Sequence, residues 1–263
     1  MSTILSRILT HKAQEVALQR QKVPLKELER QLLDAPAPRS MRKSLANSAS
    51  GIIAEFKRKS PSKGWIFQDA TPETIVPTYD AGGASALSVL TDEAFFGGSL
   101  DFLRRARSLT ELPLLRKEFI IDEYQLLEAR ATGADAILLI AAALSNERLQ
   151  HLAREAKGLG LEVLLEVHTA EELSAYCSEV DMVGINNRDL HSFQTDAERS
   201  VRLFDLLPKE ALPVSESGLL NPCVAQHLRQ VGFRGFLIGE AFMRESDPGE
   251  ALQRYIAKMT ATL

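Results

Sequence analysis

The sequence predicts an α/β protein, a closed (β/α)8 barrel preceded by an N-terminal helical extension. Eight short apolar runs recur after residue 50, and helix-like stretches separate several of them. The runs lack polar alternation, so both faces of each strand are expected to be buried, as in a parallel sheet. An open doubly wound sheet is the alternative that the same pattern allows.

The first 50 residues carry helical rather than strand signals. Apolar residues at positions 4, 5, 8, 9 and 16 lie near helical spacing, which predicts an amphipathic helix over residues 3–20. Pro24 opens a second short helix, and the alternating alanines and prolines of residues 35–38 end it. We therefore assign residues 1–50 to a helical extension.

The regular part of the chain begins at residue 51. The predicted strands are residues 51–56, 86–90, 112–115, 136–141, 161–167, 182–185, 212–215 and 235–239. The predicted helices include residues 123–132, 146–158, 170–178 and 222–231, and a further short helix starts near Glu240. No linker interrupts residues 51–263, so we expect one barrel domain over residues 1–263 rather than two domains.

Composition excludes several classes of partner. The 31 basic and 35 acidic residues leave a net charge of −4, which provides no global electrostatic reason to bind nucleic acid or an anionic membrane. No apolar run approaches the ~20 residues of a membrane span, and no signal peptide is evident. Two cysteines, Cys177 and Cys223, are expected as packed thiols in a reducing cytosol. We expect a cytoplasmic protein and a monomer, although no residue fixes the oligomeric state.

Charged and polar residues follow the carboxyl ends of the predicted strands, the face that carries catalysis in barrels. One charge at a strand end is commonly a solvated or ion-paired loop residue, but five strands end in this way. Buried charges are costly unless they are paired. A mutually neutralising ring would be one solution, and it would perturb pKa values as acid–base catalysis requires. Its members would be Lys57, Lys117, Glu55, Glu166 and Glu216.

Three glycine- or serine-containing turns point to a phosphorylated ligand. Ser217–Gly218 and residues 239–241 would place backbone N–H groups side by side, next to the start of the short helix. The loop of residues 60–64 offers hydroxyls and a cation. Each glycine alone is typical of a turn, whereas together they predict a phosphate site, which barrels often place after strands 7 and 8.

Other residue types carry weaker signals. The five histidines show no paired metal-ligand spacing, so no metal site is expected. Trp65 and the Phe95–Phe96 pair could equally wall an aromatic pocket or pack the loops. Arg104, Arg105 and Arg107 are expected on a solvated helix face.

Residues 53–64 resemble the signature segment of the indole-3-glycerol-phosphate synthase family. The resemblance continues in residues 115–120, 165–168, 184–190, 215–218 and 237–240, so it covers nearly the whole chain. No second barrel follows, as in the monofunctional members of this family. The sequence departs from the family pattern at Glu118, where Asp is usual, at Trp65, where a smaller aliphatic residue is usual, and at Glu123, where Pro is frequent.

The resemblance implies a step of tryptophan biosynthesis that needs no cofactor. Its substrate is 1-(2-carboxyphenylamino)-1-deoxyribulose 5-phosphate, and its products are indole-3-glycerol phosphate, CO2 and water. Lys117 would be the general acid at the ketone oxygen. Glu166 would serve the dehydration stage with Glu55 and Lys57 close by. The division of the later proton transfers among Glu166, Lys57 and Lys117 stays open.

The same resemblance assigns the remaining site residues. Asn186 and Glu216 would orient the sugar hydroxyls and the catalytic lysines, and Arg188 would support the substrate carboxylate or the ring of charges. The phosphate would be held by Ser60, Ser217, Gly218, Gly239 and the Glu240 backbone. The anthranilate pocket would be lined by Pro61, Phe95, Phe119 and Leu138.

Two other functions compete with this interpretation. Another phosphate-binding barrel enzyme, such as the isomerase of the same pathway, would need a Cys or Asp acid–base pair at the ends of strands one and four. Here strand one ends in Glu55 and Lys57. A non-catalytic phosphosugar-binding barrel would need phosphate contacts but no buried acid–base ring.

Overall fold

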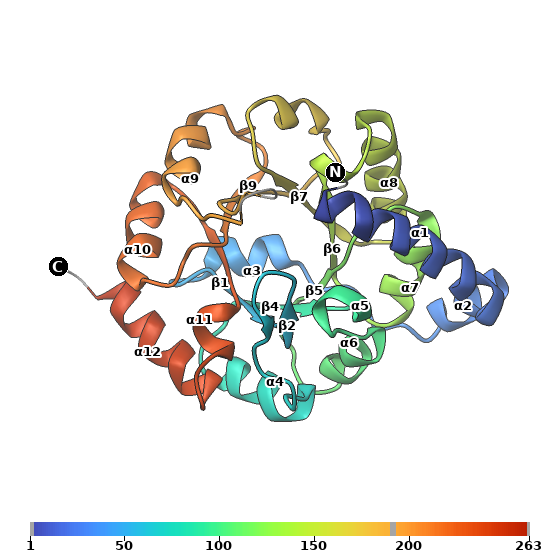
Figure 1. Cartoon of the computed structure of the whole chain (residues 1–263), viewed down its shortest axis with the longest axis horizontal. Coiled ribbons are helices and arrows are strands. Elements are labelled where there is room, and N and C mark those ends of the chain that lie inside the picture. Colours follow the sequence, from blue (N-terminus) through green and yellow to red (C-terminus); the bar gives the residue numbers. More distant parts are fainter. Residues whose placement is uncertain (1–2, 190–192, 262–263) are drawn as a thin grey trace.

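Eight parallel strands close into a barrel, as the sequence predicts (Figure 1). The computed structural model describes residues 3–189 and 193–261. The strand order is β1-β10-β9-β8-β7-β6-β5-β4, and β4 pairs with β1, so the open-sheet alternative is wrong. The barrel strands are β1 (Ile52–Phe56), β4 (Ala86–Leu90), β5 (Leu114–Lys117), β6 (Ala136–Ile140), β7 (Glu162–Val167), β8 (Met182–Asn186), β9 (Leu212–Glu216) and β10 (Gly235–Ile238).

Helices form a ring outside the strands (Figure 1). They are α4 (Pro72–Ala81), α5 (Glu93–Phe96), α6 (Leu100–Arg107), α7 (Glu123–Ala131), α8 (Asn146–Gly158), α9 (Glu198–Leu203), α10 (Pro222–Val231), α11 (Glu240–Met243) and α12 (Pro248–Thr260). Short 3₁₀ segments are η1 (Ala141–Ala143), η2 (Glu171–Ala175) and η3 (Phe204–Leu206), and a hairpin of β2 (Lys59–Ser60) and β3 (Gly64–Trp65) follows β1. Local capping sets several boundaries: the Ser145 side chain accepts from an N–H in the first turn of α8, and Asn221 does the same for α10.

The N-terminal extension contains three helices, α1 (Ile4–Lys22), α2 (Leu25–Leu32) and α3 (Met41–Asn47). The sequence predicted the first two and missed α3. Met41 and Leu45 of α3 are buried in the same cluster as the side chains that fill the barrel interior. The Ser44 hydroxyl donates to the backbone oxygen of Ser85, just before β4 begins. Helix α3 therefore closes the amino-terminal end of the barrel.

Helix α1 lies at the opposite end, across the rim formed by the carboxyl ends of the strands (Figure 1). Lys12 lies on its inner face with 1% of its side chain exposed. The Lys12 ammonium lies 3.0 Å from Asp92, which caps α5, and 3.0 Å from Glu118, which follows β5. Burial alone would lower the pKa of Lys12, but these carboxylates outweigh it and hold the pKa above its usual value.

Three details differ from the sequence predictions, and one residue of a predicted segment lies outside the described residues. Residues 170–178 form only the short 3₁₀ segment η2, and Cys177 lies beyond its end. Cys223 is exposed rather than packed. Arg107 is not solvated, because its guanidinium lies 2.8 Å from the buried carboxylate of Asp135. Leu190, the last residue of the 184–190 segment, lies outside the described residues.

Candidate active site

A cavity of about 570 Å³ opens at the carboxyl ends of the strands. All of the predicted site residues except Phe95 line it. They are Glu55, Lys57, Ser60, Pro61, Lys117, Phe119, Leu138, Glu166, Asn186, Arg188, Glu216, Ser217, Gly218, Gly239 and Glu240. Because parallel strands end at the same face of a barrel, residues far apart in the sequence meet here.

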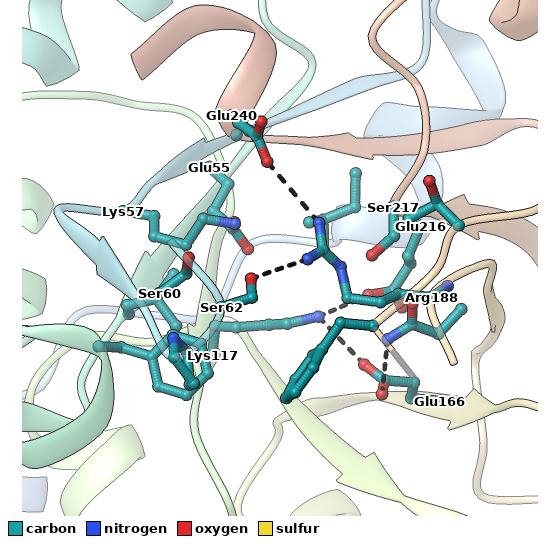
Figure 2. A pocket seen from close by; sticks show the side chains of 18 of the residues that line it. Glu55, Lys57, Ser60, Ser62, Lys117, Glu166, Arg188, Glu216, Ser217 and Glu240 are labelled. Atoms are coloured by element: carbon teal, nitrogen blue, oxygen red, sulfur yellow. Dashed lines mark hydrogen bonds and ion pairs between the residues drawn. The ribbon is translucent and has the colours of Figure 1, made fainter. Parts of the chain in front are cut away.

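Lys117 occupies the centre of the charged group (Figure 2). Its ammonium lies 2.5 Å from a carboxylate oxygen of Glu216 and 3.3 Å from one of Glu166. The Asn186 amide donates to the other oxygen of Glu166 at 3.0 Å. These contacts link the ends of β5, β7, β8 and β9 in one network.

Burial and mutual attraction shift the pKa values in this network. Burial alone would lower the pKa of Lys117, but Glu216, Glu166 and Glu55 outweigh it and hold the pKa above its usual value. Burial raises the pKa of Glu216 to about 7, despite its contact with Lys117. Burial also acts to raise the pKa of Glu166, but Lys117 and then His168 lower it below its usual value. Two carboxylates that share one lysine thus differ in proton affinity, a pattern typical of acid–base sites.

A second ion pair lies at the end of β1, where the Lys57 ammonium is 2.6 Å from the Glu55 carboxylate. Two glycines make room for the buried carboxylates of Glu55 and Glu216. A Cβ at Gly239 would lie 2.6 Å from a Glu55 carboxylate oxygen, and a Cβ at Gly184 would collide with that of Glu216. The absence of a side chain at these two positions is therefore a packing requirement of the site.

One side of the cavity is formed by the turns that follow β9 and β10, where the sequence predicts a phosphate site. Ser217 and Gly218 both have left-handed backbone conformations, with φ of 65° and 73°. This conformation is uncommon for serine, and such strain tends to occur at functional sites. Asn187 stabilises the turn, because its buried amide donates to the Ser217 oxygen at 3.1 Å and to the Ser215 hydroxyl at 3.0 Å.

Two cations reach this side from other loops. Lys63 pairs with the Glu240 carboxylate, and Arg188 lies 3.7 Å from the same carboxylate. Arg188 also donates to the Ser62 hydroxyl at 3.1 Å (Figure 2). Burial alone would raise the pKa of Glu240, but Lys63 and the other cations lower it below its usual value. The loop after β1 thus folds over the turn after β10, and both face the cavity.

The comparisons with known proteins agree with this geometry. A family model described as indole-3-glycerol phosphate synthase matches residues 5–255. The chain belongs to the indole-3-glycerol phosphate synthase family. An indole-3-glycerol phosphate synthase from Bacteroides thetaiotaomicron is 59% identical over 256 residues, which cover 97% of this chain and 98% of the relative.

Solved structures with low sequence identity share the barrel fold. Thiamine phosphate pyrophosphorylase from Pyrococcus furiosus aligns with a TM-score of 0.62 at 17% identity, over 84% of this chain and 98% of that chain. Tryptophan synthase subunit alpha from Legionella pneumophila aligns with a TM-score of 0.59 at 15% identity, over 84% and 96% of the two chains. At these identities the likeness shows the fold alone.

The aromatic side of the site differs from the assignment made by family resemblance. Phe96, and not Phe95, lines the cavity, with its ring centroid 6.0 Å from that of Phe119. Phe95 instead packs edge-on against His11 of α1, at 5.6 Å. Neighbouring residues on a helix point in different directions, so the short helix α5 can direct only one of the two rings into the cavity.

The departures from the indole-3-glycerol phosphate synthase pattern acquire physical roles. Glu118 binds Lys12 and so ties the residue after Lys117 to α1. Trp65 does not line the cavity and is 47% exposed, so it packs the loops, with Arg58 and Lys59 over its ring. Glu123 is the first residue of α7, a position where the family frequently has proline, and its carboxylate pairs with Arg148 on α8.

Sequence reasoning did not assign several lining residues. They include apolar residues of α1 and residues that follow β8: Ile4, Leu5, Ile8, Phe193, Gln194 and Thr195. The apolar face of α1 was visible in the sequence, but nothing in its periodicity indicated which part of the barrel it covers.

Within residues 3–189 and 193–261, no helix is long and apolar enough to cross a membrane.

Proposed function

We propose that this chain closes the indole ring of 1-(2-carboxyphenylamino)-1-deoxyribulose 5-phosphate and releases CO2 and water. The observation that carries the proposal is the place of Lys117. Its ammonium lies between two buried carboxylates, inside a cavity with aromatic rings on one side and the Ser217–Gly218 turn on another. The elongated substrate, with an aromatic acid at one end and a phosphate at the other, suits this arrangement.

In the first stage the aromatic carbon that bears the carboxylate attacks the ketone carbon. The carbonyl π electrons move to oxygen, which takes a proton from the Lys117 ammonium. The new carbon–carbon bond leaves the ring without aromaticity and with a positively charged nitrogen. Loss of CO2 returns the electron pair of the broken bond to the ring. This internal electron sink explains why the reaction needs no cofactor.

In the second stage a C–H bond and a C–O bond break, a C=C bond forms, and water leaves. Glu166 is the base in this proposal, because Lys117, His168 and the Asn186 amide all favour its ionised form. The leaving hydroxyl takes a proton from an ammonium group, either Lys57 or Lys117 after solvent has reprotonated it, and both lysines line the cavity. Glu216 orients Lys117 through the 2.5 Å contact.

The ends of the substrate are assigned to the two sides of the cavity. Ser60, the Ser217–Gly218 turn and the backbone at Gly239 and Glu240 bind the phosphate. Arg188 supports the charged residues on the same side through Glu240. The anthranilate ring lies among the apolar lining residues, which include Pro61, Phe96, Phe119 and Leu138.

The test is turnover by the purified protein. Incubation with the named substrate, without added metal, should produce the fluorescence of the indole product. The Lys117→Met variant is the matched control, and it should show almost none while it remains folded. No fluorescence from the wild-type protein at micromolar concentration would refute the proposed function.

The proposal includes a monomeric cytosolic enzyme in which the extension and the barrel form one domain. Light scattering coupled to size-exclusion chromatography should report the mass of one chain, 29.0 kDa. If residues 1–50 and the barrel form one cooperative unit, the far-UV circular dichroism signal and the activity should be lost at the same denaturant concentration.

A further inference from the structure

His168 directly follows β7, the strand that carries Glu166, and its imidazole lies between two carboxylates. Its Nε2 is 3.5 Å from Oε1 of Glu166, and its Nδ1 is 3.4 Å from Oε2 of Glu172. Only 7% of its side chain is exposed. Glu172 is held in place, because the same oxygen accepts the backbone N–H of His168 at 2.6 Å. The imidazole is therefore fixed against the oxygen of Glu166 that does not face Lys117.

This arrangement favours one protonation state. A neutral imidazole has one N–H group and one lone pair, whereas an imidazolium has two N–H groups. Here both ring nitrogens face a carboxylate, and a lone pair directed at either one would be repelled. Among the described residues, neither ring nitrogen has a hydrogen-bond partner, so the contacts with Glu172 and Glu166 are ion-pair contacts. Burial alone would lower the pKa of His168, but Glu172 and Glu166 outweigh it and raise the pKa above its usual value.

We propose that His168 carries a positive charge between Glu172 and Glu166, and that this charge keeps Glu166 ionised as the base of the dehydration stage. The proposal rests on the proposed function. His168 is a positioning residue, since it acts on the substrate only through Glu166.

The surrounding charges show why a second cation is needed. Lys117 lies closer to Glu216 than to Glu166, at 2.5 Å against 3.3 Å, so it is shared by two carboxylates. Its contact with Glu166 is to Oε2, which leaves Oε1 to His168 and the Asn186 amide. Each oxygen of Glu166 therefore has a positive partner. Besides Lys117, the charged groups that act on His168 or Glu166 are Glu172 on η2 and Glu216 on β9, whereas Glu55 acts on Glu216.

The experiment measures the titration of Glu166 directly. The side-chain carboxyl carbons of the glutamates are labelled with 13C, and the Glu166 resonance is identified by its loss in Glu166→Gln. In His168→Gln we expect this resonance to titrate about one pH unit or more higher than in the wild-type protein, since a neighbouring cation lowers a carboxyl pKa by about that much. The acid limb of the kcat profile should move upward by the same amount.

Two further variants sharpen the test. His151→Gln is the matched control, because His151 also pairs with a glutamate, Glu123 at 2.7 Å, but lies on α8 and does not line the cavity. It should leave both the Glu166 titration and the kcat profile unchanged. Glu172→Gln should lower the pKa of His168, which the ring resonances of His168 report.

The results separate this proposal from its alternatives. An identical titration of Glu166 in the wild-type protein and in His168→Gln would overturn the proposal, as would a loss of kcat that is equal at every pH. The second result is what a purely structural role of His168 would produce. A wild-type protein without turnover would refute the proposed function, whereas the titration of Glu166 would still decide whether His168 supplies the charge.

Discussion

Replacement of Lys12 by methionine should weaken the attachment of α1 to the barrel. Methionine keeps most of the length of the side chain and its apolar character, but it removes the charge that faces Asp92 and Glu118. Those two carboxylates each have a side-chain exposure of 1%. After the substitution they would be buried without their main cation.

The magnitude follows from this burial. Removal of one partner from a buried ion pair costs about 3–5 kcal/mol. Thr91 still donates to Glu118 at 2.7 Å, and Arg116 lies 3.9 Å away, so a larger loss is not expected. Since ~1.4 kcal/mol corresponds to a factor of ten, the equilibrium for the packed state should fall by about 10²–10⁴-fold.

Equilibrium urea unfolding followed by far-UV circular dichroism measures the change in the free energy of unfolding. Lys22→Met is the matched control, because Lys22 is exposed in the last turn of the same helix and should cost less than about 0.5 kcal/mol. The KM for the substrate should also rise in Lys12→Met, since Ile4 and Ile8 of α1 line the cavity. A loss below about 1 kcal/mol would refute the reasoning, because it would mean that the carboxylates are hydrated in solution.

Three further predictions concern the cavity. Lys117→Met should lower kcat by about 10²–10⁴-fold with an unchanged circular dichroism spectrum, as expected for loss of a general acid; a kcat within tenfold of wild type would contradict the assignment. Gly184→Ala should lower kcat by about 10²-fold, because the new methyl group displaces the Glu216 carboxylate; normal kinetics would show that Glu216 need not be so placed. Burial raises the pKa of Glu216 to about 7, so the folded state binds this proton more tightly than the unfolded state. The resulting stability is present at acidic pH and is lost as the pH rises through about 7, so Glu216→Gln should flatten the decline in unfolding free energy between about pH 5 and 7; an equal decline in both proteins would refute it.

The barrel strands could be predicted from sequence because their signal is local. Each is a short apolar run bounded by turn residues, and the predicted runs agree with β1 and β4–β10 within about two residues at each end. Helix α3 was missed because it has only seven residues, MRKSLAN. Its two buried side chains, Met41 and Leu45, are too few to give a helical pattern of apolar residues. Its helical state depends on packing at the end of the barrel, a contact that no local pattern contains.

The same distinction applies to the site. The charged residues at strand ends were predictable, since strand direction alone brings them to one face. The choice of Phe96 over Phe95 depends on the rotation of α5, and the burial of Lys12 depends on how α1 crosses the rim. His168 was visible in the sequence beside Glu166, but its second carboxylate partner, Glu172, becomes apparent only once η2 folds back.

Because α3 closes the amino-terminal end of the barrel, its position has a consequence for folding during synthesis on the ribosome. Met41 and Leu45 emerge early, yet the interior surface that they cover includes Val214 and Leu237 of β9 and β10, which emerge near the end. At ~5–20 residues per second, the roughly 200 intervening residues take about 10–40 s to appear. Throughout that interval Met41 and Leu45 lack part of the surface that buries them in the folded protein. We therefore expect the amino-terminal end of the barrel to close only after β9 and β10 have emerged.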